Sequence, residues 1–174
     1  MTTRHDTASR TAAPPTRWAG HRVTAADHPA VWELFTEPEF FFRTAQPETL
    51  AQAGITALLG DETHLITADG RPAGLWAAEP MGAEHACHHL LDLRLSARLS
   101  DEQWQSAYRE VVAALRLRTE VVRLTVRAGD FDERWTRVLR GLGLNDEGLL
   151  DGVVLRDGRR RGYHYFSQLW KDRP

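Results

Sequence analysis

The feature that most constrains the fold of this chain is a strand-like segment at residues 85–97, which is followed by an amphipathic helix. Apolar and polar residues alternate along the segment, and alternate residues of a β-strand point to opposite faces of a sheet. One face is formed by Cys87, His89, Leu91, Leu93 and Leu95, and the other by His88, Leu90, Asp92 and Arg94. We expect one face to pack on a core and the other to carry chemistry or to meet solvent.

The helix that follows this strand has a clear start. Ser100 stands three residues before Gln103, which is the spacing of a capping box. Apolar residues then recur at intervals of three and four up to Leu115, as they do on the buried side of a helix. Residues 121–126 form the next strand-like segment, so this part of the chain alternates strand, helix and strand.

The remaining segments add helices and hairpins around this centre. Asp69-Gly70 and Asp157-Gly158 are turn dipeptides of the kind that join antiparallel strands. The predicted strands span residues 21–25, 64–68, 73–78, 85–97, 121–126, 149–155 and 163–170, and the predicted helices begin near Pro29, Pro47, Ser100 and Phe131. We expect a mixed sheet covered by helices, in a single α/β domain at residues 18–174 that follows a loose tail at residues 1–17.

Composition and charge exclude several classes of protein. Cys87 is the only cysteine, so no intramolecular disulfide or cysteine-rich zinc site can form, and its place on the apolar face predicts a buried structural thiol rather than a nucleophile. The net charge of −2 gives no bulk attraction to nucleic acid or to an anionic membrane, and we expect neither as a partner. No apolar run approaches the roughly 20 residues that span a bilayer, and the N-terminus has no signal-peptide core, so we expect a cytoplasmic protein.

The segment at residues 121–170 carries a more specific pattern. It contains, in order, a strand, the polar Asp130 and Asp132, a helix that ends in Gly143-Leu144, a Glu147-Gly148 pair and a final hairpin. This segment, and the order of elements along the chain, resemble the GCN5-related N-acetyltransferase (GNAT) superfamily. The resemblance implies an α/β fold with a mixed sheet of about seven strands and about four helices packed on both faces. It also implies an N-acyltransferase that moves an acyl group from a pantetheine thioester to the amine of a small molecule.

The resemblance implies that the strands at residues 85–97 and 121–126 splay apart, and it places the acyl donor along the first of these strands, at residues 92–96. The pantetheine arm would pair with its backbone as an added strand does, and the residues expected to contact the donor are Leu93, Arg94, Leu95, Ser96, Arg98, Ser100 and Asp132. Family members usually hold the pyrophosphate of coenzyme A with a glycine-rich loop before the next helix. Here Gln103 and Gln105 stand at the two glycine positions, and Asp101 and Glu102 would repel an anion.

This departure leaves three functions open. The donor is either acyl-CoA held by side chains, or a phosphopantetheine-bound acyl group on an acyl-carrier protein, which would suit a specialised biosynthetic pathway. Arg94, Arg98 and the arginines at residues 159–161 would then meet an acidic carrier, although a charge run is usually solvated surface. The third function is a non-catalytic binding or regulatory module of GNAT shape. Monomer and homodimer both stay open, since exposed sheet edges can pair.

Catalytic residues are predicted on the polar face of the strand. His88 and Asp92 lie four residues apart and point the same way, and an imidazole near a carboxylate can act as a general base at neutral pH. The alternative is a hydrogen-bonded or solvated His88, with Asp92 paired to an arginine. Leu139 stands where family members often carry a tyrosine that acts as general acid. Tyr165 in the last strand is the predicted proton donor, unless it is an ordinary strand residue.

Two further groups of residues have a structural interpretation as well as a functional one. The aromatic run Phe40-Phe41-Phe42 falls where the GNAT fold places the acceptor, and it either lines an apolar substrate pocket or packs in the core. His85, His88 and His89 suggest a metal site, because imidazole is a common zinc ligand. Adjacent residues of a strand point to opposite faces, which separates His88 from His89, so we expect no metal.

Overall fold

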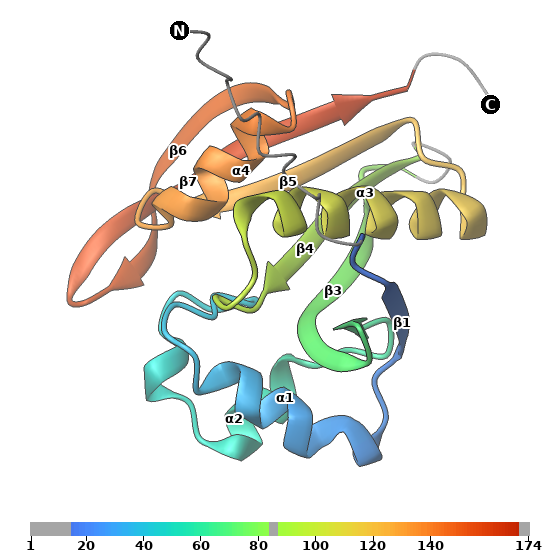
Figure 1. The fold of residues 1–174 in the computed structure, drawn as a ribbon. Helices are drawn as coiled ribbons and strands as arrows, with labels where there is room; N and C mark the ends of the chain where they lie inside the picture. The colour runs from blue at the N-terminus through green and yellow to red at the C-terminus, as the bar shows by residue number, and fades with distance from the viewer. Residues whose placement is uncertain (1–14, 84–86, 171–174) are drawn as a thin grey trace, which may run out of the picture.

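The computed structural model describes residues 15–83 and 87–170, and over these residues it contains one mixed sheet of seven strands (Figure 1). The strands are β1 (Trp18–Arg22), β2 (His64–Ala68), β3 (Arg71–Met81), β4 (His88–Leu95), β5 (Arg123–Gly129), β6 (Asn145–Arg156) and β7 (Arg159–Leu169). They lie in the order β1-β2-β3-β4-β5-β7-β6. β4 and β5 are parallel, and the other neighbouring pairs are antiparallel.

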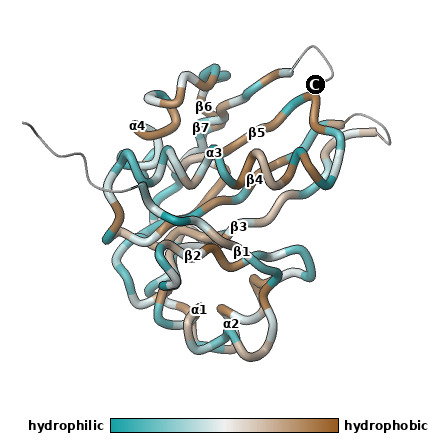
Figure 2. Tube along the Cα trace, turned by 45° about the vertical axis from the view of Figure 1, so that its right-hand side comes forward, coloured by the Kyte–Doolittle hydropathy of each residue, from teal (hydrophilic) through white to brown (hydrophobic). Residues whose placement is uncertain are grey.

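Helices cover both faces of this sheet. They are α1 (His28–Phe35), α2 (Gln52–Leu58), α3 (Asp101–Arg118) and α4 (Glu133–Gly141), with short 3-10 turns η1 (Ala25–Asp27) and η2 (Pro47–Thr49). One core cluster joins α3 and α4 to the sheet and includes Leu91, Leu93, Trp104, Leu124 and Val138. The other joins α1 and α2 to β2 and β3 and includes Val31, Leu34, Phe40, Leu65 and Leu75. Figure 2 shows the hydrophobic stretches of β3, β4 and β5 at the centre of the fold. The predicted mixed α/β architecture is confirmed.

Local sequence signals explain why several elements form where they do. Asp69 and Gly70 have φ of 51° and 79°, and Asp157 and Gly158 have φ of 50° and 71°. Two residues at positive φ make the tight turn that fits the twist of a hairpin, and Asp and Gly are the residues that tolerate it. Both predicted hairpins are therefore confirmed. The α3 capping box is also present, with Ser100 accepting from the Gln103 backbone N–H.

Several boundaries differ from the prediction. β1 begins at Trp18 instead of residue 21, because it pairs with β2 as far as Ala68. The helix predicted from Pro47 is broken, because Leu50 is extended, with φ of −87° and ψ of 127°, and packs on the second core cluster. The predicted start of β4 at His85 lies outside the described residues. Cys87 has a φ of 47° and is half-buried just before β4, so its expected place on the apolar face of the strand is wrong.

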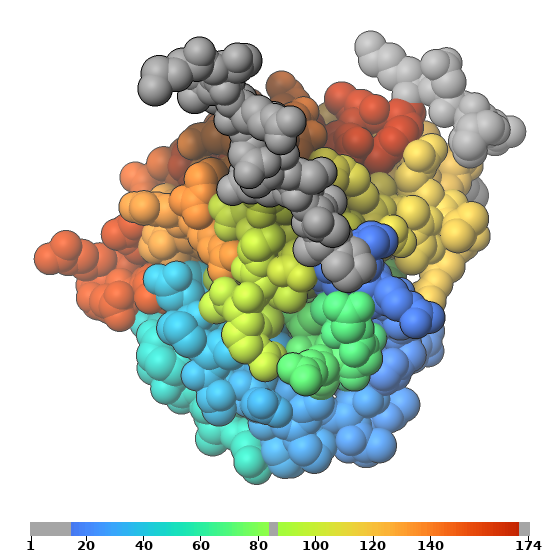
Figure 3. Space-filling model, in the orientation of Figure 1, coloured from blue at the N-terminus to red at the C-terminus, as the bar shows by residue number. Residues whose placement is uncertain are grey.

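The last hairpin differs from the rest of the sheet in its burial. β6 pairs only with β7, and its exposed apolar side chains are Leu149, Leu150, Val153 and Leu155. Figure 3 shows this hairpin projecting from one side of the molecule. Among the helices that the structure describes, none has the length and apolar character needed to cross a bilayer. The tail predicted at residues 1–17 falls mostly on residues 1–14, which lie outside the described part of the chain.

Candidate functional site

The sheet opens between β4 and β5. Their parallel pairing runs from His88 opposite Arg123 to Leu91 opposite Val126, and it ends there. Residues 92–95 of β4 keep their pairing with β3 on the other side, where Asp92 lies opposite Ala77. The two strands diverge from this point (Figure 1). One edge of β4 is therefore left without a neighbouring strand over half of its length.

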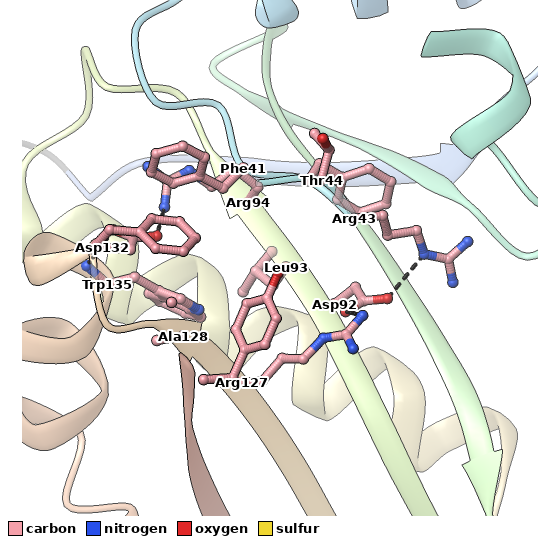
Figure 4. Close-up of a pocket in the computed structure, with 14 residues that line it drawn as sticks. Phe41, Arg43, Thr44, Asp92, Leu93, Arg94, Arg127, Ala128, Asp132 and Trp135 are labelled. Atoms are coloured by element: carbon pink, nitrogen blue, oxygen red, sulfur yellow. Dashed lines mark hydrogen bonds and ion pairs between the residues drawn. The ribbon is translucent and has the colours of Figure 1, made fainter. Parts of the chain in front are cut away.

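Side chains from several segments surround a cavity of about 40 Å³ at this divergence (Figure 4). Phe41, Arg43 and Thr44 come from the loop before α2, Asp92, Leu93 and Arg94 from β4, Arg127 and Ala128 from β5, Phe131, Asp132 and Trp135 from the start of α4, and Tyr163 from β7. Two groups of charged residues lie at opposite ends of this space (Figure 4). The cavity thus combines aromatic walls with buried charge.

A buried ion pair between Arg94 and Asp132 forms one end of the cavity. The two residues are 4% and 3% exposed, and Nη1 of Arg94 donates a hydrogen bond to Asp132. Asp132 also caps α4 by accepting from the Trp135 backbone N–H at 3.1 Å. Burial raises the pKa of the Asp132 carboxyl and lowers the pKa of the Arg94 guanidinium, while the charge of each residue opposes the shift of the other.

The Arg94 guanidinium lies between two aromatic rings. Its central carbon is 5.1 Å from the centre of the Phe41 ring and 4.9 Å from that of Trp104, which is cation–π geometry. Its Nε atom is buried, and it has no hydrogen-bond partner in the structure. Most buried polar groups in proteins have such a partner, so the Arg94 Nε is an exception within the cavity wall.

Asp92 forms the other end of the cavity together with two arginines. Its carboxylate accepts from Nε of Arg43 at 2.9 Å and lies 3.4 Å from Nη2 of Arg127. Arg43 also donates to Glu79, which is largely exposed. Asp92 itself is 9% exposed. Both arginines were missed from the sequence: Arg127 continues the alternation of Arg123 and Thr125 beyond the predicted end of its strand, whereas Arg43 carries no such signal.

Tyr163 supplies a hydroxyl group at this cavity. Burial raises the pKa of Tyr163, so the hydroxyl stays protonated at neutral pH. The Arg127 guanidinium lies 5.4 Å from the centre of its ring. Tyr165, the predicted proton donor, is on the same face of β7 two residues later, but it does not line the cavity. Of these two tyrosines, Tyr163 is the one that a ligand in the cavity would meet.

His88 and Asp92, the predicted catalytic residues, lie in different halves of β4. Nε2 of His88 is hydrogen-bonded to the Thr125 hydroxyl at 2.8 Å, in the half of β4 that pairs with β5. At about 3.3 Å per residue, four residues of strand separate His88 from Asp92 by about 13 Å, which is too far for a direct contact. Burial, followed by the charge of Arg123, lowers the pKa of His88. Asp92 takes the alternative that the sequence left open, a pairing with arginine.

The aromatic run divides between core and cavity. Phe40 and Phe42 are each 1% exposed and belong to the core cluster under α1, and Phe42 also borders the cavity, which Phe41 lines. Phe41 meets the ring of Phe131 edge-on at 5.1 Å, and Arg156 lies 4.6 Å from the Phe41 ring centre. The core interpretation therefore describes Phe40, the pocket interpretation describes Phe41, and Phe42 takes part in both.

The residues predicted to contact the donor also divide. Leu93, Arg94 and Asp132 line the cavity, and Leu95 lies in the core. Ser96 is 1% exposed and donates to the Glu37 carboxylate at 2.8 Å. Arg98 contacts Ser96 at 3.0 Å and Glu37 at 3.0 Å, so both side chains are engaged within the protein.

The first turn of α3, where the GNAT resemblance places a pyrophosphate, is occupied by the protein itself. Ser100 and Gln103 each accept a hydrogen bond from the other's backbone N–H. Asp101 accepts from Arg134 at 2.9 Å and from Arg137 at 3.1 Å. Arg134 also donates to the backbone carbonyls of residues 97 and 99 in the preceding loop. The loop thus directs carbonyl oxygens toward a guanidinium, the opposite of an N–H cradle for phosphate.

The histidines do not assemble into a metal site in the described part of the chain. Within residues 15–83 and 87–170, His, Cys, Asp and Glu side chains form no group of three that could hold an ion. His85 lies outside these residues.

Comparison with known proteins identifies the fold. The sequence matches no protein-family model and no curated protein. Solved structures nevertheless match most of the chain. An acetyltransferase of the GNAT family from Streptococcus pneumoniae has a TM-score of 0.66 at 13% identity, covering 88% of this chain and 100% of that one. The chain has the GNAT fold. Two other solved proteins with this fold are named as enzymes that act on ribosomal proteins.

The first is RimL, the ribosomal L7/L12 alpha-N-protein acetyltransferase in complex with coenzyme A. It has a TM-score of 0.72 at 10% identity, covering 87% of this chain and 93% of its own. The second is the ribosomal-protein-alanine N-acetyltransferase from Brucella melitensis, with a TM-score of 0.66 at 16% identity, covering 87% of this chain and 99% of its own. The TM-scores and coverages establish the GNAT fold, and the reaction is argued from the site.

Proposed function

We propose that this protein is an N-acyltransferase that moves an acyl group from a pantetheine thioester to an amine. The observation that carries the proposal is the divergence of β4 from β5 after Leu91 in a chain with the GNAT fold. The open edge at residues 92–95 offers backbone groups with which the amides of a pantetheine arm can pair as an added strand does. The named activities of the solved proteins with this fold support the same reaction class.

The cavity residues suit the chemistry of aminolysis. The amine attacks the thioester carbonyl, a C–N bond forms and the C–S bond breaks; the nitrogen loses one proton, and the leaving thiolate takes one up. Tyr163 is the proposed donor of that proton, because it is protonated at neutral pH and lines the cavity. Asp92 is the proposed acceptor of a hydrogen bond from the attacking amine, since its carboxylate lies at the cavity wall. His88 is bonded to Thr125 outside the cavity, and we assign it no contact with substrate.

The start of α3 favours a donor that lacks an adenosine pyrophosphate. The two arginines that could hold phosphate there, Arg134 and Arg137, already contact Asp101. A pantetheine thioester borne by an acyl-carrier protein places no pyrophosphate at this position. We therefore propose a carrier-bound donor, with the small-molecule amine of a biosynthetic pathway as acceptor and acyl-CoA as the competing donor.

A second function, binding without catalysis, is favoured by one observation. The cavity is small, and the Arg94–Asp132 pair forms part of its wall, so a pantetheine arm needs more room than the closed cavity offers. A regulatory module of GNAT shape would keep this pair closed. Turnover separates the two functions, because only the enzyme releases a thiol.

Calorimetric titration with acetyl-CoA and then with an acetyl-loaded carrier protein tests the donor directly. Release of free thiol in the presence of a panel of amines tests the reaction. We expect micromolar binding of the loaded carrier, weaker binding of acetyl-CoA, and thiol release that depends on an amine. If neither donor binds and no thiol is released, the proposal of an enzyme is contradicted.

A further inference from the structure

The cavity at the β4–β5 divergence carries a surplus of positive charge. Arg43, Arg94 and Arg127 line it, whereas the acidic lining residues are Asp92 and Asp132, which leaves one positive charge in excess. The Glu79 carboxylate that also contacts Arg43 is 59% exposed and is screened by solvent. The side chains of Arg94, Arg43 and Arg127 are 5%, 15% and 34% exposed. A positive charge withdrawn from water in this way is costly unless a negative group meets it. The lining is therefore complementary to a ligand that carries one negative charge.

The orphan nitrogen of Arg94 shows where such a group would bind. Nη1 of Arg94 contacts Asp132, while Nε is buried and has no acceptor. A guanidinium presents its N–H groups in a fixed fork that matches the two oxygens of a carboxylate. One further oxygen at Nε would satisfy the last buried donor of this side chain. The cation–π contact of Phe41 holds the guanidinium in place for it.

The size of the cavity selects among anions. A volume of about 40 Å³ compares with the 10–15 Å³ or so that one water needs by this measure, so the cavity has room for roughly three heavy atoms. A carboxylate has three heavy atoms and one charge. A phosphate has five heavy atoms and a charge between one and two at neutral pH, so it fits neither the volume nor the single surplus charge.

We propose that this cavity binds a free carboxylate group of a substrate, held by Arg94 and neutralising the surplus charge of the lining. The inference rests on the proposed acyl transfer and narrows its substrate class. The carboxylate belongs either to the amine acceptor, as in an amino acid, or to the acyl group, as in a dicarboxylic acyl thioester. Both sources present the same chemistry to Arg94.

Two matched pairs of probes distinguish the sources by calorimetry, without any need for turnover. β-Alanine and β-alaninamide differ only in the carboxylate of an acceptor. The succinyl and succinamoyl thioesters of N-acetylcysteamine differ only in the carboxylate of an acyl group, and they need neither CoA nor a carrier. We expect the acid of one pair to bind at least tenfold more tightly than its amide. The pair that shows the preference identifies the source.

Variants locate the preference at Arg94. The double variant Arg94→Met with Asp132→Asn removes both buried charges, and asparagine keeps the N-cap of α4. In this variant we expect the ratio of the affinity for the acid to the affinity for the amide to fall to about one. Arg94→Lys keeps a charge for Asp132 but loses the fork, and we expect a several-fold fall. The control is Arg140→Gln with Asp146→Asn, which removes an ion pair between α4 and β6 outside the cavity and should leave this ratio unchanged.

The outcomes separate this inference from the proposed function. Four outcomes would each overturn the carboxylate site. Two concern the preference: acid and amide bind equally in both pairs, or the preference survives in the double variant. The other two are that inorganic phosphate alone binds, or that neither acid binds at millimolar concentration. Thiol release that is indifferent to the carboxylate would keep the acyltransferase and reject the site. An acid preference without thiol release from any thioester would keep the site and reject the acyltransferase.

Discussion

The two halves of β4 satisfy their polar groups in different ways. Residues 88–91 pair with strands on both sides, and the polar side chain of His88 makes one hydrogen bond to Thr125. Residues 92–95 have lost one neighbouring strand, and here the buried charges of Asp92 and Arg94 meet partners from a loop and from the start of α4. Side-chain ion pairs thus stabilise the part of the sheet that backbone pairing leaves open, and the same opening is where a ligand can bind.

The largest expected effect comes from breaking the open half. Arg94→Met leaves the Asp132 carboxylate buried without its cation, which should lower the free energy of unfolding by about 3–5 kcal/mol. Adding Asp132→Asn should recover most of this loss, because no unpaired charge then remains. His88→Leu in the paired half should cost only about 1 kcal/mol for one hydrogen bond. Urea denaturation measures all three variants, and equal costs in the two halves would contradict the comparison.

The next effect concerns catalysis at the open half. Tyr163→Phe removes the proposed proton donor but keeps the ring, so kcat should fall by about 100-fold while the affinity for the thioester donor stays the same. Tyr165→Phe is the matched control on the same face of β7, outside the cavity, and should change kcat less than about twofold. Steady-state kinetics with thiol release measures both variants. A larger loss in Tyr165→Phe would return the proton donor to the position predicted from the sequence.

A smaller effect, in the opposite direction, is expected beyond the end of the open half, at the start of α3. Asp101→Asn frees Arg134 and Arg137 from their carboxylate, so the affinity for CoA should rise by about fivefold, or about 1 kcal/mol. The gain in affinity should shrink at high salt, since these groups are partly exposed to solvent. Glu102→Gln makes the same change in charge one residue later and should give a smaller gain in affinity for CoA. Calorimetry at two salt concentrations would contradict the idea if both variants bound CoA equally.

The smallest effect is a pH dependence that resides in the paired half. Burial lowers the pKa values of His88 and His89, so the unfolded chain binds protons at these sites more readily than the folded chain. Their contribution to stability is complete above the unfolded pKa of about 6.5 and is lost as the pH falls through the folded pKa. Stability should therefore be lower near pH 5 than near pH 7.5, as urea midpoints would measure.

His88→Gln combined with His89→Gln should flatten this slope. A part will remain, since burial also lowers the pKa of His64, which lies on β2 outside both halves of β4. An unchanged slope in the double variant would assign the whole pH dependence to other groups.

The parts of the fold that the sequence predicted depend on residues close together in the chain. The α3 capping box joins residues three apart, and each Asp-Gly turn needs two adjacent residues at positive φ. The site depends on distant pairs: Arg43 is 49 residues from Asp92, and Arg94 is 38 residues from Asp132. Alternation along a strand tells which face a side chain takes, but it does not tell which partner arrives from elsewhere. The divergence of β4 from β5 came from the GNAT resemblance and from no periodicity.

The place of β7 in the sheet has a consequence for how the chain assembles. β7 lies between β5 and β6, so β6 reaches the rest of the sheet only through a strand that is made after it. The β6–β7 hairpin closes a two-residue turn and can form within microseconds, whereas the pairing of Val126 with Phe166 must close a loop of 40 residues or so. We therefore expect the hairpin to form first and to dock on β5 as a unit. Until it docks, β5 presents a bare edge, which is the stage at which the folding chain is most exposed to pairing with other chains.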